Sequence, residues 1–278
     1  MPHPFFAPKH PIVIGHRGTA GTHPENTIAS FAAALDQGAQ VLESDVHVSR
    51  DGVPILLHDP HVDRVTEAKG LASDLDWADL RVLDAGYRVE DASGNHPDRG
   101  HGHRIPSLEE TFASFPGTRF NLEIKCHDAA AIAATLDLVE RFDRSARTLL
   151  AAGEDEIMRD LRAALARHAA EPAMGASLAE IVAAVTSALA PTDPTAEIRS
   201  SSGMPSGVMA LQIPPDFAGR PLATTELITH AHAHGVEVHI WTINEIEEIE
   251  MLLARGADGI ITDFPGRMAN WLKRDERP

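Results

Sequence analysis

Short apolar runs alternate with helix-like segments along almost the whole chain, and this alternation constrains the fold more than any other feature. The pattern is typical of parallel strands that are joined by crossover helices. It predicts an α/β fold. The runs that we expect to form strands are residues 12–14, 41–46, 120–124, 148–151, 173–176, 208–213, 236–241 and 259–261.

Eight strands with interleaved helices favour a closed TIM (β/α)8 barrel over an open sheet. A length of 278 residues fits one such barrel, so we expect residues 1–278 to form a single domain. The segments expected to be helical are residues 25–37, 129–142, 154–168, 178–189, 224–234, 245–254 and 267–272.

Three segments interrupt the alternation. Asp51-Gly52 lies between two short apolar runs, and this pair favours the tight turn of a β-hairpin, which we expect to extend the second strand. Residues 59–106 are rich in Asp, Gly, Arg and His, and they predict an insertion that lies over one mouth of the barrel as a cap. Residues 190–207 are expected to form a surface loop.

Composition excludes several classes of function. The formal net charge of −17 opposes binding to nucleic acid through its phosphates, and no basic cluster reverses it locally. No apolar run approaches the roughly 18 residues that a membrane span requires. Cys126 is the only cysteine, so no disulfide can form within the chain. The N-terminus has no apolar segment of signal-peptide length, and we expect a cytoplasmic protein.

Two acidic residues lie on one face of the second predicted strand. Glu43 and Asp45 are two positions apart, and alternate residues of a strand point the same way. Like charges at a half-buried site repel each other unless a cation neutralises them. Hard oxygen ligands favour Mg²⁺ or Ca²⁺, so the pair predicts a divalent metal site.

Further residues with chemical potential fall on neighbouring strands. Glu123 and Lys125 share a face of the third strand, which offers a third carboxylate to the same metal and a cation beside it. His16 and His58 each follow a short apolar run, at the carboxyl mouth where barrels present their catalytic residues. These positions predict two proton carriers beside a metal.

This set of residue types fits the cleavage of a phosphodiester. A divalent ion neutralises phosphoryl charge, Arg17 can donate two parallel hydrogen bonds to phosphate oxygens, and Lys125 adds a point charge. One histidine would accept the proton of the nucleophile, while the other would protonate the leaving alkoxide.

The run from residue 15 to residue 59 resembles the glycerophosphodiester phosphodiesterase family. The family's His-Arg-Gly, Pro-Glu-Asn-Thr, Glu-x-Asp and His-Asp elements match here in order and spacing. Further family-like elements extend through nearly the whole chain: Asp63-Arg64, Leu83-Asp84-Ala85-Gly86, Ile105-Pro106-Ser107-Leu108-Glu109-Glu110, Glu123-x-Lys125, Trp241-Thr242-Ile243-Asn244 and Gly259-Ile260-Ile261-Thr262-Asp263-Phe264-Pro265.

The resemblance implies a TIM barrel with an insertion after the His-Asp element, and it implies a role for each candidate residue. Glu43, Asp45 and Glu123 would bind the divalent metal, and His16 and His58 would form the acid–base pair. Arg17 and Lys125 would hold phosphate, and Trp241 would wall the alcohol pocket. The implied reaction converts a glycerophosphodiester, a small molecule, into sn-glycerol 3-phosphate and an alcohol.

Structural roles remain open for several of these residues. Arg17 could simply pair with a barrel acid, including Glu43, and Lys125 could serve only to neutralise Glu123. Trp241 could belong to the core. The residues Glu25, Asn26 and Asp263 are expected to support the site rather than to react.

Two other functions remain open as well. A lysophospholipase D would use the same site on a lysophospholipid and would contact a membrane surface transiently. An apolar groove beside the metal, formed by the insertion and by residues 204–213, would favour that reading, whereas a narrow polar pocket would favour deacylated substrates. A barrel that binds a phosphate ligand without catalysis is the third possibility.

Overall fold

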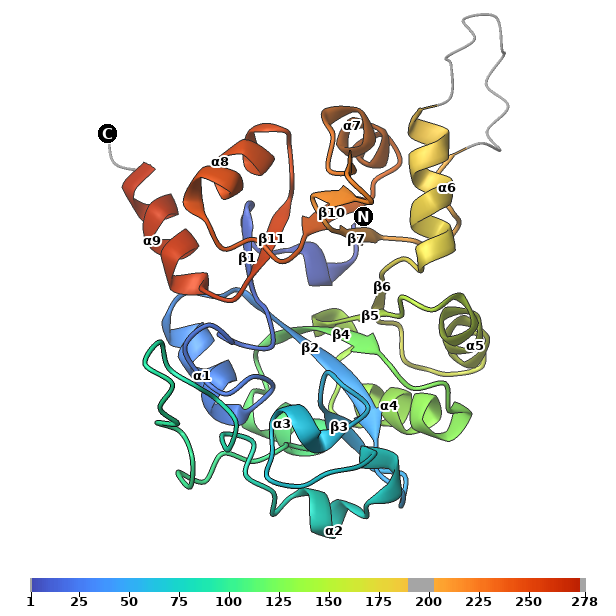
Figure 1. Cartoon of the computed structure of the whole chain (residues 1–278). Coiled ribbons are helices and arrows are strands. Elements are labelled where there is room, and N and C mark those ends of the chain that lie inside the picture. The colour runs from blue at the N-terminus through green and yellow to red at the C-terminus, as the bar shows by residue number, and fades with distance from the viewer. Residues whose placement is uncertain (1, 190–202, 276–278) are drawn as a thin grey trace, which may run out of the picture.

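Eight parallel strands form the barrel that the sequence predicts. The structure is a computed structural model that describes residues 2–189 and 203–275. Neighbouring strands follow the order β6-β5-β4-β2-β1-β11-β10-β7 (Figure 1). The parallel strands in these ranges are β1 (Ile12–Gly15), β2 (Val41–Val48), β4 (Arg119–Ile124), β5 (Thr148–Ala151), β6 (Ala173–Met174), β7 (Ala210–Ile213), β10 (Glu237–Ile240) and β11 (Gly259–Thr262).

The barrel is nearly closed at the seam between β6 and β7. The backbone N–H of Met209, just before β7, donates to the carbonyl oxygen of Met174 in β6 at 2.9 Å. The carbonyl oxygen of Met209 in turn accepts from the N–H of Glu237 in β10 at 3.0 Å. The first bond joins the two outer strands of the ladder through Met209, which the second bond ties to β10, and the TIM-barrel prediction is confirmed.

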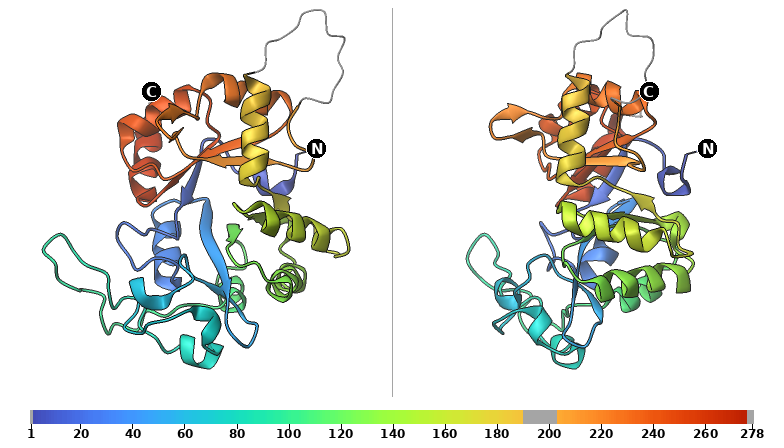
Figure 2. Two further views of the ribbon diagram at one scale, coloured as in Figure 1. Left: turned by 45° about the vertical axis from the view of Figure 1, so that its right-hand side comes forward. Right: turned by 90° about the vertical axis from the view of Figure 1, so that its right-hand side faces the viewer.

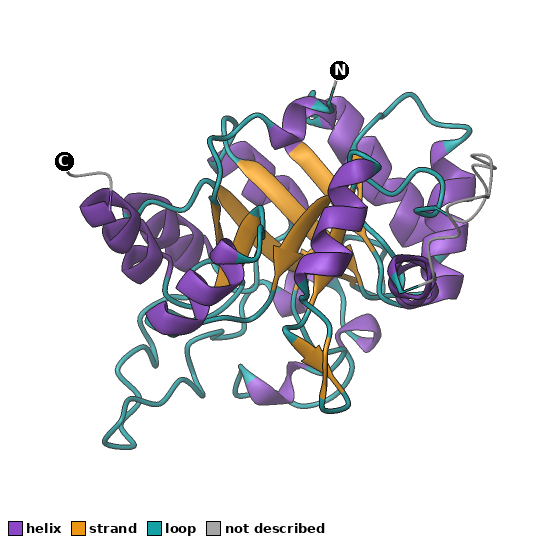
Figure 3. Cartoon of the chain, turned by 90° about the horizontal axis from the view of Figure 1, so that it is seen from above, coloured by secondary structure: helices purple, strands orange, loops and turns teal. Residues whose placement is uncertain are grey.

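Helices surround the strands, as Figure 3 shows from above. Each barrel strand is followed by a helix before the next one begins, apart from β2, where the hairpin and the insertion come first. No helix in the described ranges is long and apolar enough to cross a bilayer. The helices are α1 (Ile28–Asp36), α2 (Trp77–Leu80), α3 (Leu108–Ser114), α4 (Ala129–Arg141), α5 (Asp155–Leu165), α6 (Leu178–Ala188), α7 (Thr225–Ala233), α8 (Ile246–Ala254) and α9 (Pro265–Asp275).

Helix α1 begins three residues later than the sequence predicts. Thr27 is its N-cap and accepts a hydrogen bond from the N–H of Ser30, which satisfies one of the free donors of the first turn. Asn26 has a φ of 55°, in the left-handed region, so it cannot belong to the helix. The chain between β1 and α1 is therefore a structured loop.

The core inside the barrel lies at the amino ends of the strands. Ile12 and Val41, the first residues of β1 and β2, pack there with Phe5, which comes from the 3-10 helix Pro4–Phe6. Phe5 is fully buried, so the N-terminal segment fills this end of the barrel. Two larger apolar clusters lie outside the strands and pack them against the helices. The carboxyl ends of the strands are left for polar side chains.

The predicted hairpin and insertion are both present. Strand β3 (Pro54–Leu56) pairs antiparallel with β2, with His47 opposite Ile55, which confirms the hairpin. Residues 59–106 contain α2 and two 3-10 helices, Val62–Arg64 and Ala72–Asp74, which pack on a small apolar cluster of their own. In both views of Figure 2, this insertion lies on the opposite side of the barrel from α6.

A second hairpin was not predicted. Strands β8 (Asp216–Phe217) and β9 (Arg220–Pro221) are antiparallel, and the turn residues Ala218 and Gly219 have φ values of 52° and 73°. Two positive φ values in succession are typical of the tight turns in hairpins. Of the loop predicted at residues 190–207, positions 190–202 lie outside the described residues, and positions 203–207 lead into β7 without regular structure.

Candidate active site

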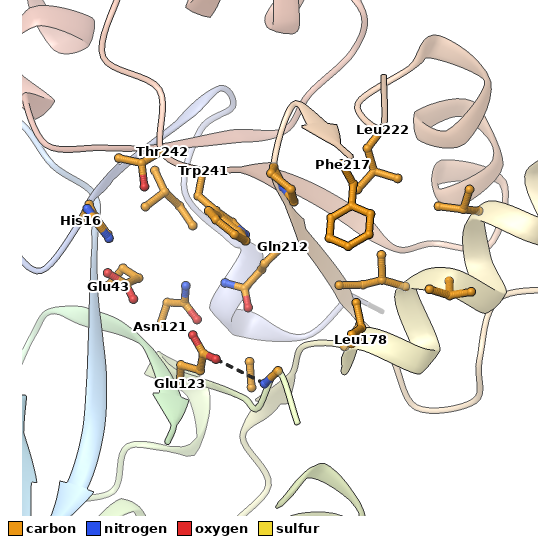
Figure 4. A pocket seen from close by; sticks show the side chains of 18 of the residues that line it. His16, Glu43, Asn121, Glu123, Leu178, Gln212, Phe217, Leu222, Trp241 and Thr242 are labelled. Carbon is orange, nitrogen blue, oxygen red and sulfur yellow. Dashed lines mark hydrogen bonds between the residues drawn. The ribbon is translucent and has the colours of Figure 1, made fainter. Parts of the chain in front are cut away.

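A pocket of about 730 Å³ opens at the carboxyl ends of the barrel strands (Figure 4). Its polar end carries the ionisable side chains, and its other end is apolar. No lining residue in the described ranges comes from positions 59–106, so a cap role for the insertion stays a prediction. The eight residues singled out from the sequence all line this pocket: His16, Arg17, Glu43, Asp45, His58, Glu123, Lys125 and Trp241.

His16 follows β1 at a tight turn. A side chain at Gly15 would place its Cβ 2.3 Å from the carbonyl oxygen of Gly18, so only glycine fits there. Nδ1 of His16 lies 2.7 Å from Oδ1 of Asp263, and Nδ2 of Asn244 donates to the other oxygen of Asp263 at 2.8 Å. The ring is therefore held by a carboxylate that is itself fixed.

The environment of His16 acts on its pKa in two directions. Burial disfavours the imidazolium, but the hydrogen bond to Asp263 and the negative charge of Glu43 favour it more strongly. The net effect raises the pKa of His16 above its ordinary value of 6.5. His16 therefore keeps its proton to a higher pH than an exposed histidine does.

His58 follows the hairpin strand β3 and is held in a similar way. Its Nδ1 lies 2.6 Å from Oδ1 of Asp59, whose other oxygen accepts from Nε of Arg64 at 2.5 Å. Two further nitrogens of Arg64 donate to both oxygens of Glu25 at 2.7 Å each. Arg64 ends the 3-10 helix Val62–Arg64 of the insertion. It thus connects Asp59, the partner of His58, to Glu25 in the loop after β1.

Glu43 and Asp45 lie on the same face of β2, as the alternation of a strand requires. Both are buried, with 8% and 1% of their surface exposed. Burial and the neighbouring charge of Asp45 raise the pKa of Glu43 to about 7. The backbone N–H of Arg17 donates to Oε2 of Glu43 at 3.0 Å and partly offsets this effect.

Glu123 is brought beside Asp45 by the register of the sheet, in which the two residues are direct partners on β4 and β2. Nζ of Lys125 lies 2.9 Å from Glu123 and 3.5 Å from Asp45. Burial lowers the pKa of Lys125, but these carboxylates outweigh it and the pKa is raised. Lys125 thus neutralises both acids, a broader pairing than the expected one with Glu123 alone.

The guanidinium of Arg17 pairs with a barrel acid, as the open alternative allowed, and this acid is Asp45 rather than Glu43. Its guanidinium lies 3.0 Å from Glu25 and 3.5 Å from Asp45, whereas Glu43 receives only its backbone N–H. The Nε of Arg17 is buried and has no hydrogen-bond partner among the described residues. This same Nε lies 3.5 Å from Oδ2 of Asp45, so the guanidinium is held between the carboxylates of Glu25 and Asp45.

The donor chemistry of the three carboxylates fits Mg²⁺ or Ca²⁺, because both ions prefer oxygen ligands. The high pKa of Glu43 also fits, since a divalent ion would stabilise the charged form of this buried acid. In the described parts of the chain, however, no group of three or more His, Cys, Asp or Glu side chains is arranged closely enough to hold a metal. In this structure the negative charge of Asp45 and Glu123 is neutralised by ion pairs with Lys125 and Arg17.

The apolar end of the pocket was not anticipated in this position. It lies between α6 and the β8–β9 hairpin; the insertion does not line the pocket, and residues 204–213 contribute only the polar Gln212 to it. Figure 4 shows Leu178 facing Phe217 and Leu222 there, while Trp241 lies between this end and the polar one. The apolar lining residues on the two sides include Leu178, Ile181, Val182, Val185, Leu189, Phe217, Pro221 and Leu222.

The comparison with known protein families agrees with the geometry. The profile of the glycerophosphoryl diester phosphodiesterase family matches residues 16–267. The chain belongs to this family. The resemblance found in the motifs is confirmed, and the match spans all the residues that line the pocket, together with Asp263.

Relatives in the family carry two kinds of name. "Probable glycerophosphodiester phosphodiesterase 2" of Mycobacterium tuberculosis is 31% identical over 254 residues, which cover 91% of this chain and 87% of the relative. Lysophospholipase D GDPD1 of Homo sapiens is 29% identical over 284 residues, which cover 96% and 87%. The family therefore includes proteins named for both of the substrate classes considered above.

A solved structure in the family contains a reaction product. An Oleispira antarctica phosphodiesterase in complex with the product sn-glycerol-3-phosphate is 25% identical to this chain, with a TM-score of 0.73. The match covers 95% of this chain and 97% of the other. The structural match thus covers almost the whole length of both chains.

Sequence reasoning missed the partners of the two imidazoles. Asp263 was expected to support the site, but its contact with His16 was not foreseen, and Arg64 was noted only as a motif residue. Asp59 could have been found, because it directly follows His58 in the chain. Asp263 and Arg64 reach the site only through barrel closure and through the path of the insertion, which no local pattern reveals.

Proposed function

We propose that the chain hydrolyses glycerophosphodiesters to sn-glycerol 3-phosphate and an alcohol, with His16 and His58 as the acid–base pair. The observation that carries this proposal is the matched support of the two rings. Each histidine has its Nδ1 engaged by a carboxylate, from Asp263 and Asp59 respectively. Such a partner fixes the tautomer, so Nε2 is the ring nitrogen left for a reacting group.

The role of each residue follows from the charges that a bound phosphodiester carries. The guanidinium of Arg17 and the ammonium of Lys125, which both line the pocket, would hold phosphoryl oxygens. One imidazole would take the proton of the attacking hydroxyl or water, and the other would give a proton to the leaving alkoxide. A Mg²⁺ or Ca²⁺ ion held by Glu43, Asp45 and Glu123 would supply further positive charge against the phosphoryl group.

Product analysis tests this function directly. Purified protein is incubated with glycerophosphocholine and with Mg²⁺ or Ca²⁺, and phosphorus NMR with a choline assay follows the products. We expect sn-glycerol 3-phosphate and choline in equal amounts. Phosphocholine and glycerol would instead mean that the other ester bond breaks. Tight binding of glycerophosphocholine without turnover at saturating metal would support the non-catalytic barrel.

Lysophospholipase D activity is the second candidate, and the apolar end of the pocket favours it. This end continues from the polar residues, and the volume of about 730 Å³ exceeds what a glycerophosphodiester alone needs. A comparison of lysophosphatidylcholine with glycerophosphocholine at equal monomer concentration separates the two. A higher kcat/KM for the lysolipid would support this candidate, and an equal or lower value would support deacylated substrates.

The cytoplasmic location of the protein stays a prediction.

A further inference from the structure

Several large apolar side chains are exposed around the apolar end of the pocket. Leu178 and Val182 of α6 are 52% and 55% exposed, Phe217 of the β8–β9 hairpin is 62% exposed, and Trp241 is 43% exposed. We call these four residues the apolar rim. They come from three separate segments but line one pocket, so they form a continuous surface rather than scattered apolar residues.

Helix α6 makes little use of its apolar residues in the protein core. Its eleven residues are rich in Leu, Ile, Val and Ala. Ala184 is the only buried one, and Ile181, Val185 and Ala188 pack half-buried against the core. Helix α4, by contrast, buries six residues against the barrel. A capping box formed by Ser177 and Glu180 fixes the start of α6, and Arg162 of α5 donates to Glu180 at 2.9 Å. The first turn of α6, which carries the exposed Leu178, is therefore fixed by polar contacts.

We propose that the apolar rim docks the protein on a zwitterionic lipid surface, and that an alkyl chain passes from this surface into the groove between α6 and the β8–β9 hairpin. This proposal rests on the phosphodiesterase function, because the groove leads to the polar end that holds His16 and His58. The partner is thus a lipid interface, and the substrate it delivers is an amphiphilic phosphodiester with a single chain.

Continuity with the pocket favours a lipid surface over a second copy of the chain. A folded protein seated on the rim would cover the mouth of the groove on this side and hinder access to the polar end. A fluid lipid layer buries the same side chains and can still release one chain into the groove. Exposed aromatic and aliphatic residues are the usual means by which proteins enter the boundary between headgroups and acyl chains.

The charges near the rim favour a zwitterionic surface over an anionic one. Asp216 and Arg220 flank the exposed ring of Phe217 on the hairpin, and Arg220 is the direct cross-strand partner of Phe217. One acid and one base leave the hairpin with no net charge. The whole chain carries a formal net charge of −17, which would repel anionic headgroups at low salt.

Vesicle flotation tests the proposal without any reaction. The wild-type protein, Phe217→Ser and Val182→Ser are compared on phosphatidylcholine and on phosphatidylglycerol vesicles. Met251→Ser and Val82→Ser serve as controls, because these residues are also exposed but lie outside the pocket. We expect Phe217→Ser to lower the partition coefficient on phosphatidylcholine by about tenfold, since a buried aromatic side chain gains that much on transfer from water. The controls should bind like the wild type.

A second measurement guards against loss of folding in the variants. Brominated phosphatidylcholine quenches tryptophan fluorescence at short range, so quenching should fall in Trp241→Phe while Trp77 and Trp271 remain. Circular dichroism of each variant checks that the fold is retained. The proposal is overturned if the wild type stays unbound to phosphatidylcholine, if rim and control variants bind equally, or if Phe217→Ser instead breaks a dimer in light scattering.

These outcomes are separate from those of the proposed function. Hydrolysis of glycerophosphocholine without vesicle binding would reject the docking surface and leave the phosphodiesterase function standing. Vesicle binding without hydrolysis of any glycerophosphodiester would reject the proposed function and leave a lipid-binding barrel. Binding to phosphatidylglycerol that exceeds binding to phosphatidylcholine would contradict the role given to charge.

Discussion

Nδ1 of His16 lies 2.7 Å from Oδ1 of Asp263, although 247 positions separate the two residues in the sequence. The contact exists because β1 and β11 are neighbouring parallel strands, with Gly15 opposite Thr262. The residues that follow them therefore emerge side by side at the carboxyl mouth. Closure of the barrel thus supplies the first imidazole with its carboxylate.

Replacement of Asp263 by Asn should lower the pKa of His16. Asp263 raises that pKa through its hydrogen bond and its charge, whereas burial alone lowers it. We expect the limb of the pH–rate profile that belongs to His16 to move to lower pH, whether His16 acts as acid or as base. The value of kcat should also fall by about tenfold, as is usual when an orienting partner is lost. Asp79→Asn, on the exposed part of α2, is the control. An unchanged profile in Asp263→Asn would argue against this role.

Arg64 should affect turnover without touching substrate. It holds Asp59, the partner of His58, and it also binds both oxygens of Glu25. We expect Arg64→Gln to lower kcat by about 10- to 100-fold with little change in KM, because the ring of His58 loses its fixed orientation. Arg81→Gln removes an exposed arginine that lies 3.7 Å from Glu110, and it should leave kcat unchanged. A change confined to KM in Arg64→Gln would place this residue in substrate binding instead.

Divalent metal should stabilise the protein more at pH 8 than at pH 5. The pKa of Glu43 is raised to about 7, so the folded state keeps a proton that the unfolded chain has lost between about pH 4.5 and pH 7. Stability attributable to Glu43 therefore falls as the pH rises through this window. A metal restores it at pH 8 by binding the charged carboxylate, whereas at pH 5 it must first displace the proton.

Thermal unfolding measures this effect. At saturating Mg²⁺ or Ca²⁺ we expect Tm to rise by roughly 3 °C at pH 8, with a smaller rise at pH 5. Glu43→Gln should lose most of the metal-induced rise, while Glu250→Gln on the exposed side of α8 should keep it. An equal rise at both pH values, or a full rise in Glu43→Gln, would argue against a metal held by Glu43.

Arg144 is a structural cation far from the chemistry. It is 1% exposed, and its guanidinium donates to the carbonyl oxygens of Phe115, Pro116 and Thr118, in the segment before β4. Burial lowers the pKa of Arg144 to about 10, and the charge of Arg147 adds to the effect.

We expect Arg144→Met to lower the free energy of unfolding by roughly 3 kcal/mol, because three carbonyl groups lose their donor. Arg159→Met removes an exposed cation from α5 and should change it by about 0.5 kcal/mol or less. Urea denaturation measures both. Equal effects of the two substitutions would show that the bonds of Arg144 contribute little.

The sequence was most informative where local pattern and tertiary structure agree. Strands of a closed barrel are apolar because both faces are covered, so all eight could be predicted. The period of two along β2 placed Glu43 and Asp45 on one face, and the carboxyl end of β1 placed His16 at the mouth. These inferences needed only local chain geometry. His58 also lines the pocket, but it follows the antiparallel hairpin strand β3, so its position depends on how the hairpin folds back along β2.

The unpredicted features depend on contacts between distant segments. Strands β8 and β9 have two residues each and contain Pro221, so no strand pattern could form, although Ala218-Gly219 was a usable turn signal. Helix α6 was predicted, but its apolar composition did not reveal that it lines a pocket as well as packing on the core. The pairing of Arg17 with Glu25 and Asp45 depends on loop conformation alone.

Turnover of glycerophosphocholine by His16→Ala and His58→Ala tests the central claim most directly. Both variants are assayed with saturating Mg²⁺ or Ca²⁺ beside the wild type and beside His101→Ala, which removes an exposed histidine of the insertion. The acid–base role predicts that each of the two substitutions lowers kcat by about 10²- to 10⁴-fold, while His101→Ala keeps the wild-type rate. Wild-type turnover in either His16→Ala or His58→Ala would contradict it.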